Sequence, residues 1–292
     1  MKNLGIEKDS LFVIDGTNLI HRNYYVFQNM RNKDGIHIGG LYGTIRSLQN
    51  YVNNFNPKQM VICFDKGKET FRHQMYPDYK GTRKKTDEEL KSQFALFEEF
   101  CGLANLPFVE MDSYEADDLI GSLCCNSKEY GLKSYAVTGD KDIFQLIDNE
   151  IDVLYLSHKG PVMYGEEEFV SEYGIQPSQF IDYKALVGDA SDNIPGVRGV
   201  GKKTAEKLLK SYGSLDKIYN NVDKLKGKQK ERIIENKDIA YLSKKLSTIK
   251  CDIELNYDRY FIDYTNEGYN LENSKVIIFL NGLGFQLKIV EK

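Results

Sequence analysis

The sequence predicts an α/β fold in which a mostly parallel sheet is flanked by helices and followed by an all-helical region. Three observations support this. Apolar runs typical of buried strands end at Asp15, Asp65 and Asp140. Strand-like and helix-like segments alternate as far as residue 157, which is typical of a parallel sheet covered on both faces. From about Gly174 onward, only helix-like segments follow.

The expected strands and helices follow from the local pattern of apolar and polar residues. The expected strands lie at 11–15, 59–64, 107–110, 132–138 and 151–157. The expected helices of the first region lie at 17–29, 39–55, 86–104 and 114–130, with a short helix after Asp142. Thr86 and Glu89 have the spacing of a capping box for the third of these helices. The helical region is expected at 177–188, 202–212, 214–220, 224–236 and 237–247.

Composition argues against several classes of protein and of metal site. Hydrophobic content of 41% and charged content of 28% are those of a soluble globular protein. The five cysteines form no C-x-x-C pair and the four histidines no H-x-x-x-H pair, which argues against zinc and for reduced thiols. The sequence has no signal peptide or apolar span, so we expect a cytoplasmic protein with no membrane association.

Acidic residues carry the strongest chemical signal. Nine carboxylates lie in five short motifs: Asp15, Asp65, Glu115, Asp117, Asp118, Asp140, Asp142, Asp189 and Asp192. Removing nine negative charges from the net charge of −4 leaves +5, so a basic face can surround an acidic pocket. Because three of these aspartates end strands, we expect them to converge at the carboxyl edge of the sheet. Oxygen ligands of this kind suit Mg²⁺ or Mn²⁺.

Each motif alone is compatible with an ordinary structural role. Asp15-Gly16-Thr17 can be a capped turn, and acidic residues near position 115 suit a helix start because they offset the helix dipole. A haloacid-dehalogenase-type phosphatase would need a nucleophilic aspartate two residues before Asp15, where Val13 stands. The closely spaced aspartates after residue 188 can be a solvated loop. The motifs together are far more specific than any one of them.

A glycine-rich segment follows the last acidic motif. Gly196, Gly201 and Lys202 nearly match a phosphate-binding P-loop, but Lys203 replaces the required Ser or Thr, and Pro195 precedes the segment in place of a strand. A helix-hairpin-helix fits better, because glycines allow close approach to a phosphate and the helix start offers free amides. A purely structural glycine turn is the alternative.

The segment 66–85 is strongly basic and contains interleaved tyrosines. If it is helical, its aromatic and cationic side chains form one stripe suited to a nucleic-acid strand: Tyr76, Tyr79, Lys80 and Arg83. A solvated basic loop is the alternative. Arg22 lies two helical turns beyond Asp15 and can reach the same pocket mouth, and a surface or ion-pair role is the nearly equal alternative.

Taken together, the motifs resemble the 5′ nucleases, a family that includes flap endonucleases and the 5′→3′ exonuclease domain of bacterial DNA polymerase I. The resemblance lies in IDGTNLIHR, FDKGKETFRHQMYPDYKGTR, YEADDLIG, TGDKDIFQL and GDASDNIPGVRGVGKKTA, and runs from about residue 10 to 270. It implies a PIN-like catalytic domain at 1–174 with a helical arch at about 66–100. It also implies a helical DNA-binding region at 175–292 with a helix-hairpin-helix at about 186–212.

The resemblance also implies roles for single residues. Asp15, Asp65, Glu115 and Asp117 would organise a first metal ion, and Asp140, Asp142, Asp189 and Asp192 a second, with Asp118 supporting or bridging. Lys80, Arg83 and Arg22 would stabilise the scissile phosphate. The remaining residues expected to contact DNA are Tyr76, Tyr79, Lys84, Gly196, Gly199, Gly201, Lys202, Lys203 and Thr204.

The implied activity is a free-standing 5′→3′ exonuclease and flap endonuclease that uses two Mg²⁺ or Mn²⁺ ions, with K⁺ at the hairpin. Its expected substrates are DNA 5′ ends, flaps and nicks, including RNA primers on DNA, in replication and repair. We expect a monomer. Two other classes stay open: a non-catalytic binder of forked or flapped DNA, and a metal-dependent phosphatase of small phosphoesters.

Overall fold

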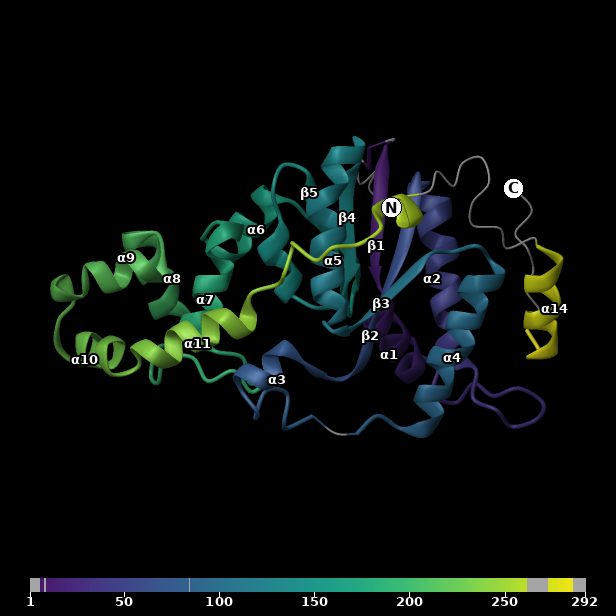
Figure 1. The fold of residues 1–292 in the computed structure, drawn as a ribbon, viewed down its shortest axis with the longest axis horizontal. Helices are drawn as coiled ribbons and strands as arrows, with labels where there is room; N and C mark the ends of the chain where they lie inside the picture. The colour runs from purple at the N-terminus through teal and green to yellow at the C-terminus, as the bar shows by residue number, and fades with distance from the viewer. Residues whose placement is uncertain (1–5, 8, 84, 262–272, 286–292) are drawn as a thin grey trace.

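The computed structural model describes residues 6–7, 9–83, 85–261 and 273–285 (Figure 1). Within these residues a six-stranded sheet forms the centre of the molecule. Its strand order is β3 (Phe108–Ser113), β2 (Gln59–Thr70), β1 (Ser10–Asp15), β4 (Lys133–Thr138), β5 (Ile151–Ser157) and β6 (Gly160–Tyr164). Neighbouring strands are parallel except β5 and β6, so the expected mostly parallel α/β fold is confirmed.

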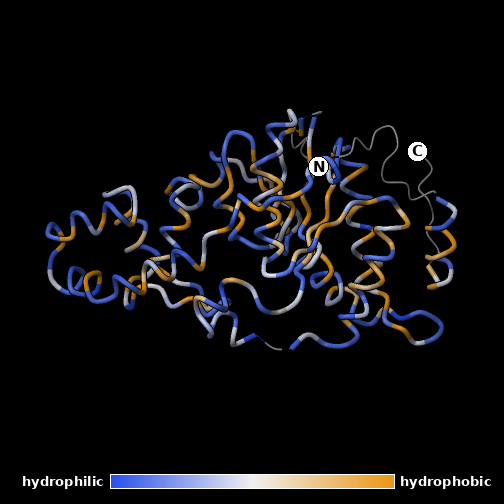
Figure 2. The backbone as a smooth tube through the Cα atoms, in the orientation of Figure 1, coloured by the Kyte–Doolittle hydropathy of each residue, from blue (hydrophilic) through white to orange (hydrophobic). Residues whose placement is uncertain are grey.

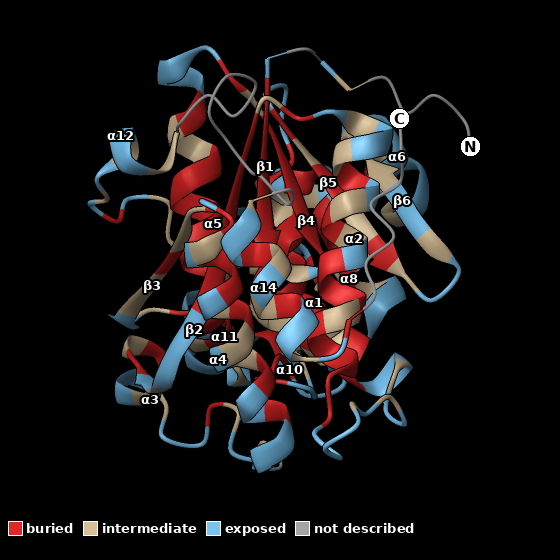
Figure 3. Cartoon of the chain, turned by 90° about the vertical axis from the view of Figure 1, so that its right-hand side faces the viewer, coloured by how far each residue is buried: buried red, intermediate tan, exposed pale blue. Residues whose placement is uncertain are grey.

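Alternation along β1 explains how the sheet is covered. Successive side chains of a strand point to opposite faces. Leu11 and Val13 pack on one face, and Phe12 and Ile14 on the other, all without exposed surface. The first face is covered by α5 (Ala116–Asn126), and the second by α1 (Gly16–Val26), α2 (Gly39–Phe55) and α4 (Glu88–Leu103). Figure 3 shows the central strands as almost wholly buried.

The register of the strands places three of their carboxyl ends together. Asp15, the last residue of β1, pairs with Cys63 of β2, and its neighbour Ile14 pairs with Val137 of β4. Asp65 therefore lies two residues beyond the position beside Asp15. A shared edge of this kind is where open α/β sheets bind their ligands.

The segment expected to form the arch leaves the sheet at the end of β2. It continues through α3 (Phe71–Met75) and a loop to α4, and crosses below the strand ends in Figure 1. Two details differ from expectation. Residues 76–83 form turns, and Lys80 has a positive φ of 53°, so they do not make the helical stripe that their spacing allows. The cap of α4 is Asp87, which accepts from the amide of Glu89, and not Thr86.

The region after residue 174 is helical, as expected. It contains α7 (Phe180–Val187), α8 (Lys202–Tyr212), α9 (Leu215–Asn220), α10 (Gly227–Glu235) and α11 (Lys237–Ser247). These helices form a lobe beside the sheet, to the left in Figure 1. In the described part of the chain, no helix combines the length and the hydropathy that a membrane span requires. Figure 2 shows apolar residues concentrated in the central strands and hydrophilic ones in the loop before α4.

Other differences are local. β6 was not expected, because its five residues have the pattern of a turn and an exposed segment, but it pairs with β5 through a tight hairpin at Gly160. The helix expected at 114–130 is split into α5 and a 3₁₀ turn at Ser127–Tyr130. Two further helices, α6 (Glu166–Tyr173) and α14 (Ser274–Gly282), lie at the periphery (Figure 1).

Candidate metal centre and nucleic-acid interface

Asp15 lies at the centre of the strand edge and is buried. Its carboxylate accepts hydrogen bonds from the amide of Asn18, at 2.8 Å, and from the hydroxyl of Thr138, at 2.7 Å. Burial, with the negative charges of Asp65 and Asp140 nearby, raises its pKa to about 7 despite both hydrogen bonds. A carboxyl group held in this way favours a bound cation, which would restore its charged form.

Three further carboxylates surround Asp15. Burial raises the pKa of Asp117, in the first turn of α5, well above its usual range, and the charges of Asp140 and Asp15 add to the rise. Asp65 accepts from the amide of Ala116, at 2.9 Å, which joins the end of β2 to the start of α5. Asp15, Asp65, Asp117 and Asp140, here the inner acidic cluster, make no ion pair with any described side chain.

The donor chemistry of the inner acidic cluster fits a hard divalent cation. It offers only carboxylate oxygens, the ligands of Mg²⁺ and Mn²⁺. In the described residues no group of three or more His, Cys, Asp or Glu side chains lies in an arrangement that could hold a metal ion. Mg²⁺ keeps several water molecules and commonly uses only one or two carboxylates, so an open arrangement suits it.

The loop between α3 and α4 places cations on the rim of the cluster. Lys80 lies 2.8 Å from the carboxylate of Glu115, and Arg83 lies 2.5 Å from that of Asp192. The buried hydroxyl of Tyr79 lies between these acids, 3.0 Å from Glu115 and 3.2 Å from Asp192. The predicted arch cations and two predicted acids therefore meet, although in the sequence they lie up to 112 positions apart.

A buried lysine joins two more of the predicted acids. Lys184 of α7 lies 2.6 Å from Asp142 and also pairs with Asp189. Burial raises the pKa of Asp142 to about 7, with the charge of Asp140 adding to the rise. Burial also acts upward on the pKa of Asp189, but the Lys184 ammonium and the Ser191 hydroxyl and amide outweigh it and hold the value at about 2. One ammonium group is thus shared between two carboxylates at this side of the site.

Asp118 differs from the other eight acids because a single guanidinium engages both of its oxygens. Arg72 binds it in a bidentate ion pair with two contacts of 2.7 Å, and neither side chain is accessible to solvent to more than 3%. The same guanidinium donates to the carbonyls of Leu246 and Thr248 at the end of α11, and lies 3.2 Å from Glu115. Arg72 therefore connects the base of the arch, the start of α5 and the helical lobe.

Arg22 lies at the same edge of the sheet but contacts no carboxylate in the described residues. Its guanidinium donates to the carbonyl oxygens of Leu156, at 2.7 Å, and Ser157, at 2.6 Å, at the end of β5. This contact fixes α1 to β5. The partners of the Arg22 guanidinium are thus backbone atoms.

The glycine-rich segment forms a tight turn before α8. Gly196 has a φ of 63°, and a Cβ atom there would lie 2.3 Å from the amide nitrogen of Gly188. Gly199, with a φ of 79°, accepts from Arg232 through its carbonyl. Gly201 is the N-cap of α8 and has open space around it. The exposed side chains of Lys202 and Lys203 follow at the helix start, where amides can meet an anion.

The other residues predicted to contact DNA differ in how available their side chains are. Tyr79 is 3% exposed, so its ring is not available for stacking on a base in this arrangement. Tyr76 is half-buried, and the amide of Thr204 donates to the carbonyl of Gly201. Lys84 lies outside the described residues.

Sequence reasoning did not single out three residues at the site. Arg72 and Lys184 are both buried and cationic. Arg72 lies within the basic segment 66–85 and Lys184 within the helix expected at 177–188, and nothing in the local pattern distinguishes either residue. His21 lies near Asp65 and Arg83, and burial lowers its pKa. No local pattern identifies such partners, because each pairing joins segments that are distant in the sequence.

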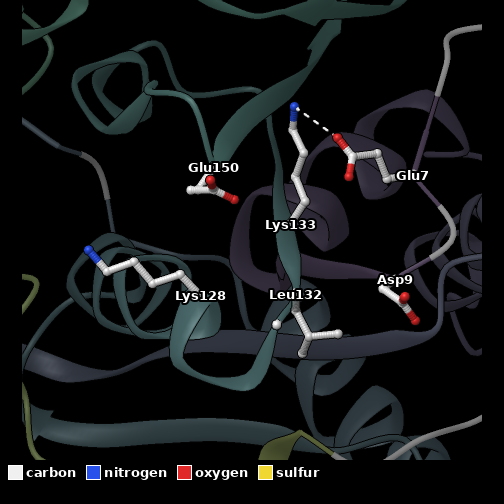
Figure 4. Close-up of a pocket in the computed structure, with 7 residues that line it drawn as sticks. Glu7, Asp9, Lys128, Leu132, Lys133 and Glu150 are labelled. Carbon is white, nitrogen blue, oxygen red and sulfur yellow. Dashed lines mark ion pairs between the residues drawn. The ribbon is translucent and has the colours of Figure 1, made fainter.

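A separate cavity of about 470 Å³ opens near the amino ends of β1 and β4 (Figure 4). It is lined by Glu7, Asp9, Lys128, Gly131, Leu132, Lys133 and Glu150. Lys133 points toward Glu7 across it. Its acids and lysines offset one another, and it lies at the opposite end of the strands from the inner acidic cluster, so we assign it no part in the site.

Comparison with known families accounts for nearly the whole chain. A family model for the 5′-3′ exonuclease N-terminal resolvase-like domain matches residues 10–174, and one for the 5′-3′ exonuclease C-terminal SAM fold matches 175–267. DNA polymerase I of Bacillus caldotenax is 37% identical over 285 residues, which are 96% of this chain and 32% of that protein. DNA polymerase I of Bacillus subtilis strain 168 is 38% identical over 283 residues, with the same coverage.

Solved structures share the fold. T5 5′-exonuclease with bound zinc has a TM-score of 0.68 and 24% identity, covering 82% of this chain and 89% of that one. The catalytic core of Rad2 in complex with a DNA substrate has a TM-score of 0.65 and 16% identity, covering 98% and 91%. The chain spans about a third of the length of the curated relatives it matches. Because the two family models adjoin at residue 174 and together span the sheet and the helical lobe, the chain belongs to the 5′-3′ exonuclease family.

Proposed function

We propose that this chain is a divalent-metal-dependent 5′→3′ exonuclease and flap endonuclease that hydrolyses DNA phosphodiesters to 5′-phosphate and 3′-hydroxyl ends. The observation that carries the proposal is the inner acidic cluster: four carboxylates that pair with no described cation, facing the cations of Lys80 and Arg83. An acidic floor below a cationic rim fits a site that binds metal ions and a phosphate together. Primer removal and repair are the cellular roles we expect.

The carboxylates divide by position. We assign Asp15, Asp65, Glu115 and Asp117 to a first Mg²⁺ or Mn²⁺ ion, and Asp140, Asp142, Asp189 and Asp192 to a second. When bound, such ions lower the pKa of a coordinated water and neutralise charge on the phosphate and the leaving oxygen. Asp118 supports the site indirectly, because its ion pair with Arg72 holds the start of α5 in place.

The rim cations exchange partners when substrate arrives. Lys80 and Arg83 pair with Glu115 and Asp192 in the free chain. A scissile phosphate offers them a stronger partner and frees both carboxylates for metal ions. We expect Arg22 to assist at the phosphate after leaving its two carbonyl partners at the end of β5. The hydroxyl of Tyr79 donates to Glu115 and Asp192, so metal ions on these two carboxylates would release it, and Tyr79 and Tyr76 could then order the 5′ strand.

The helical lobe supplies the grip on the duplex. We place the division between the catalytic and helical regions at residues 174 and 175, where α6 ends and the lobe begins. The amides of Gly201, Lys202 and Lys203 at the start of α8 would bind a backbone phosphate without reading sequence, and carbonyls of 196–201 could bind K⁺. DNA is present in the Rad2 complexes and divalent ions in the T5 structures, and we extend both ligands to this chain.

A cleavage assay tests the proposal. Labelled flap, nicked, gapped and blunt duplexes, and an RNA-primed duplex, are incubated with the protein with and without Mg²⁺, and the products are mapped. We expect metal-dependent cleavage near the junction, lost in Asp117→Asn. Binding of flaps without cleavage would favour a non-catalytic role. Hydrolysis of small phosphoesters alone would favour a phosphatase.

A further inference from the structure

Two cysteines from distant parts of the chain meet beside α5. The chain that leaves α11 crosses over α5 in Figure 1 and brings Cys251 against it. The sulfur of Cys251 lies 3.3 Å from where a Cβ atom of Gly121 would be, and Cys125 stands about one helical turn further along α5. Gly121 and Cys125 are four residues apart, so they share one face of the helix.

The register between this segment and α5 is fixed by other contacts. The hydroxyl of Ser122 donates to the carbonyl of Lys250, at 3.3 Å, and accepts from the amide of Ile253, at 3.2 Å. The side-chain amide of Asn126 lies 3.4 Å from the carbonyl of Cys251 and donates to it. The absence of a side chain at Gly121 allows the approach, because a Cβ atom there would lie only 2.7 Å from the carbonyl of Lys250. The fold therefore holds Cys251 against the face of α5 that carries Cys125.

Accessibility and reactivity separate this pair from the other cysteines. Cys125 and Cys251 are both partly exposed, whereas Cys63, Cys101 and Cys124 are buried. Burial raises the pKa of each of those three thiols. The hydrogen bond from the thiol of Cys251 lowers the pKa of Cys125, so Cys125 is the thiol of the pair that ionises first.

We propose that Cys125 and Cys251 form an oxidant-responsive dithiol site that closes to a disulfide across the junction of α5 and the segment after α11. The oxidant is a small-molecule disulfide. The thiolate of Cys125 attacks one of its sulfurs, which forms a mixed disulfide and releases one thiol. The thiolate of Cys251, having lost its proton to water, then attacks the sulfur of Cys125 and releases the second thiol. Two protein thiols are oxidised and one external disulfide is reduced.

Closure would tie the helical lobe to the sheet domain. The bond joins residues separated by about 125 positions, a loop length at which cross-linking restricts the unfolded chain strongly. It leaves the acidic site itself untouched, because Cys125 lies ten residues along α5 from Glu115, roughly 15 Å at the helical rise. Oxidised and reduced chains should therefore differ in the rigidity of this junction.

Peptide mapping tests the site. The full chain is treated with oxidised glutathione at about pH 8, blocked by alkylation, digested and analysed without reduction. We expect a linked peptide that joins Cys125 to Cys251 and disappears on reduction. Cys251→Ser should instead accumulate a glutathione adduct on Cys125, since its resolving thiol is gone. Cys124→Ser is the matched control and should form the linked peptide as the wild type does.

Three results would overturn the proposal. One is a stable glutathione adduct on Cys125 of the wild type without any linked peptide. Another is no reaction at Cys125, and a third is linkage through Cys124. Thermal unfolding separately tests whether the disulfide stabilises the junction of the helical lobe and the sheet domain. The oxidised chain should unfold on the order of 5–10 °C higher than the reduced chain. An unchanged Tm would refute a stabilising link at this junction. Neither readout uses DNA or metal ions, so the outcome is independent of the proposed nuclease activity.

Discussion

Asp15→Asn should stabilise the metal-free protein while removing its response to Mg²⁺. Asp15 is 5% exposed and accepts hydrogen bonds from Asn18 and Thr138. An asparagine keeps the size and one acceptor oxygen of the side chain but removes the charge. The charge is costly in the folded state, because burial and the neighbouring acids raise the pKa of Asp15 from 3.8 to about 7. The substitution therefore exchanges a strained carboxylate for a neutral group.

The size and sign of the effect follow from that shift. A carboxyl group whose pKa is raised on folding binds more protons in the folded state than in the unfolded state. Stability is then lost as pH rises from about 4 to about 7, the window set by the two pKa values. A shift of about 3 units corresponds to about 4 kcal/mol. Because Asp65 and Asp140 share the repulsion, we expect roughly half of this, about 2 kcal/mol, for Asp15 alone at about pH 8.

Urea denaturation in the presence of a chelator measures the effect. At about pH 8, Asp15→Asn should be more stable than the wild type by about 2 kcal/mol, and at about pH 4 the difference should be lost. Adding Mg²⁺ should stabilise the wild type and leave the variant nearly unchanged. Asp252→Asn, at a side chain that is 79% exposed, is the matched control and should change neither quantity.

A metal-free Asp15→Asn protein that is no more stable than the wild type at about pH 8 would refute the reasoning. It would mean that the hydrogen bonds to Asp15, or cations near it, already compensate its charge. Equal stabilisation of both proteins by Mg²⁺ would place the ion elsewhere.

Three other substitutions probe the remaining parts of the site. Arg72→Met should destabilise the fold by about 3–5 kcal/mol, because it leaves the buried carboxylate of Asp118 unpaired; chemical denaturation measures this, and a loss below about 1 kcal/mol would contradict the pairing. Lys80→Ala should lower the single-turnover cleavage rate by at least about tenfold with little change in DNA affinity, whereas equal losses in both would indicate a simple phosphate anchor. Joint substitution of Lys202 and Lys203 by Ala should weaken duplex binding and reduce the slope of its salt dependence by roughly 2, and an unaltered slope would remove the start of α8 from the interface.

The strand ends could be predicted from the sequence because burial leaves a strong pattern. Short apolar runs that stop at Asp15 and Asp65 suit a buried strand better than a helix or a loop, and parallel strands must bring their carboxyl ends to one edge. The helices were predicted for the same reason, with errors at their ends. Thr86 and Asp87 are both good N-caps, so sequence alone could not decide which one begins α4.

The partners of the charges could not be predicted in the same way. Arg72 and Lys184 stand in unremarkable helical patterns, and what distinguishes them is burial against acids from other segments. Likewise, Tyr79 has the spacing of a stacking aromatic, yet its hydroxyl is drawn between Glu115 and Asp192. Pairings of this kind depend on the full three-dimensional packing, and no local period encodes them.

Four cations pair with the acids outside the inner acidic cluster. Their side chains differ in solvent exposure, and the exposure indicates which of them can exchange partners. Side-chain exposure rises from 3% for Arg72 and 10% for Lys184 to 18% for Lys80 and 51% for Arg83. A buried ion pair is costly to separate, whereas an exposed one is worth little. Arg72 and Lys184 are therefore fixed parts of the scaffold, and Lys80 and Arg83 are the cations that can leave their carboxylates for a phosphate. Since the latter two hold Glu115 and Asp192, we expect the arrival of a phosphate and the completion of the acidic site to be coupled through the same side chains.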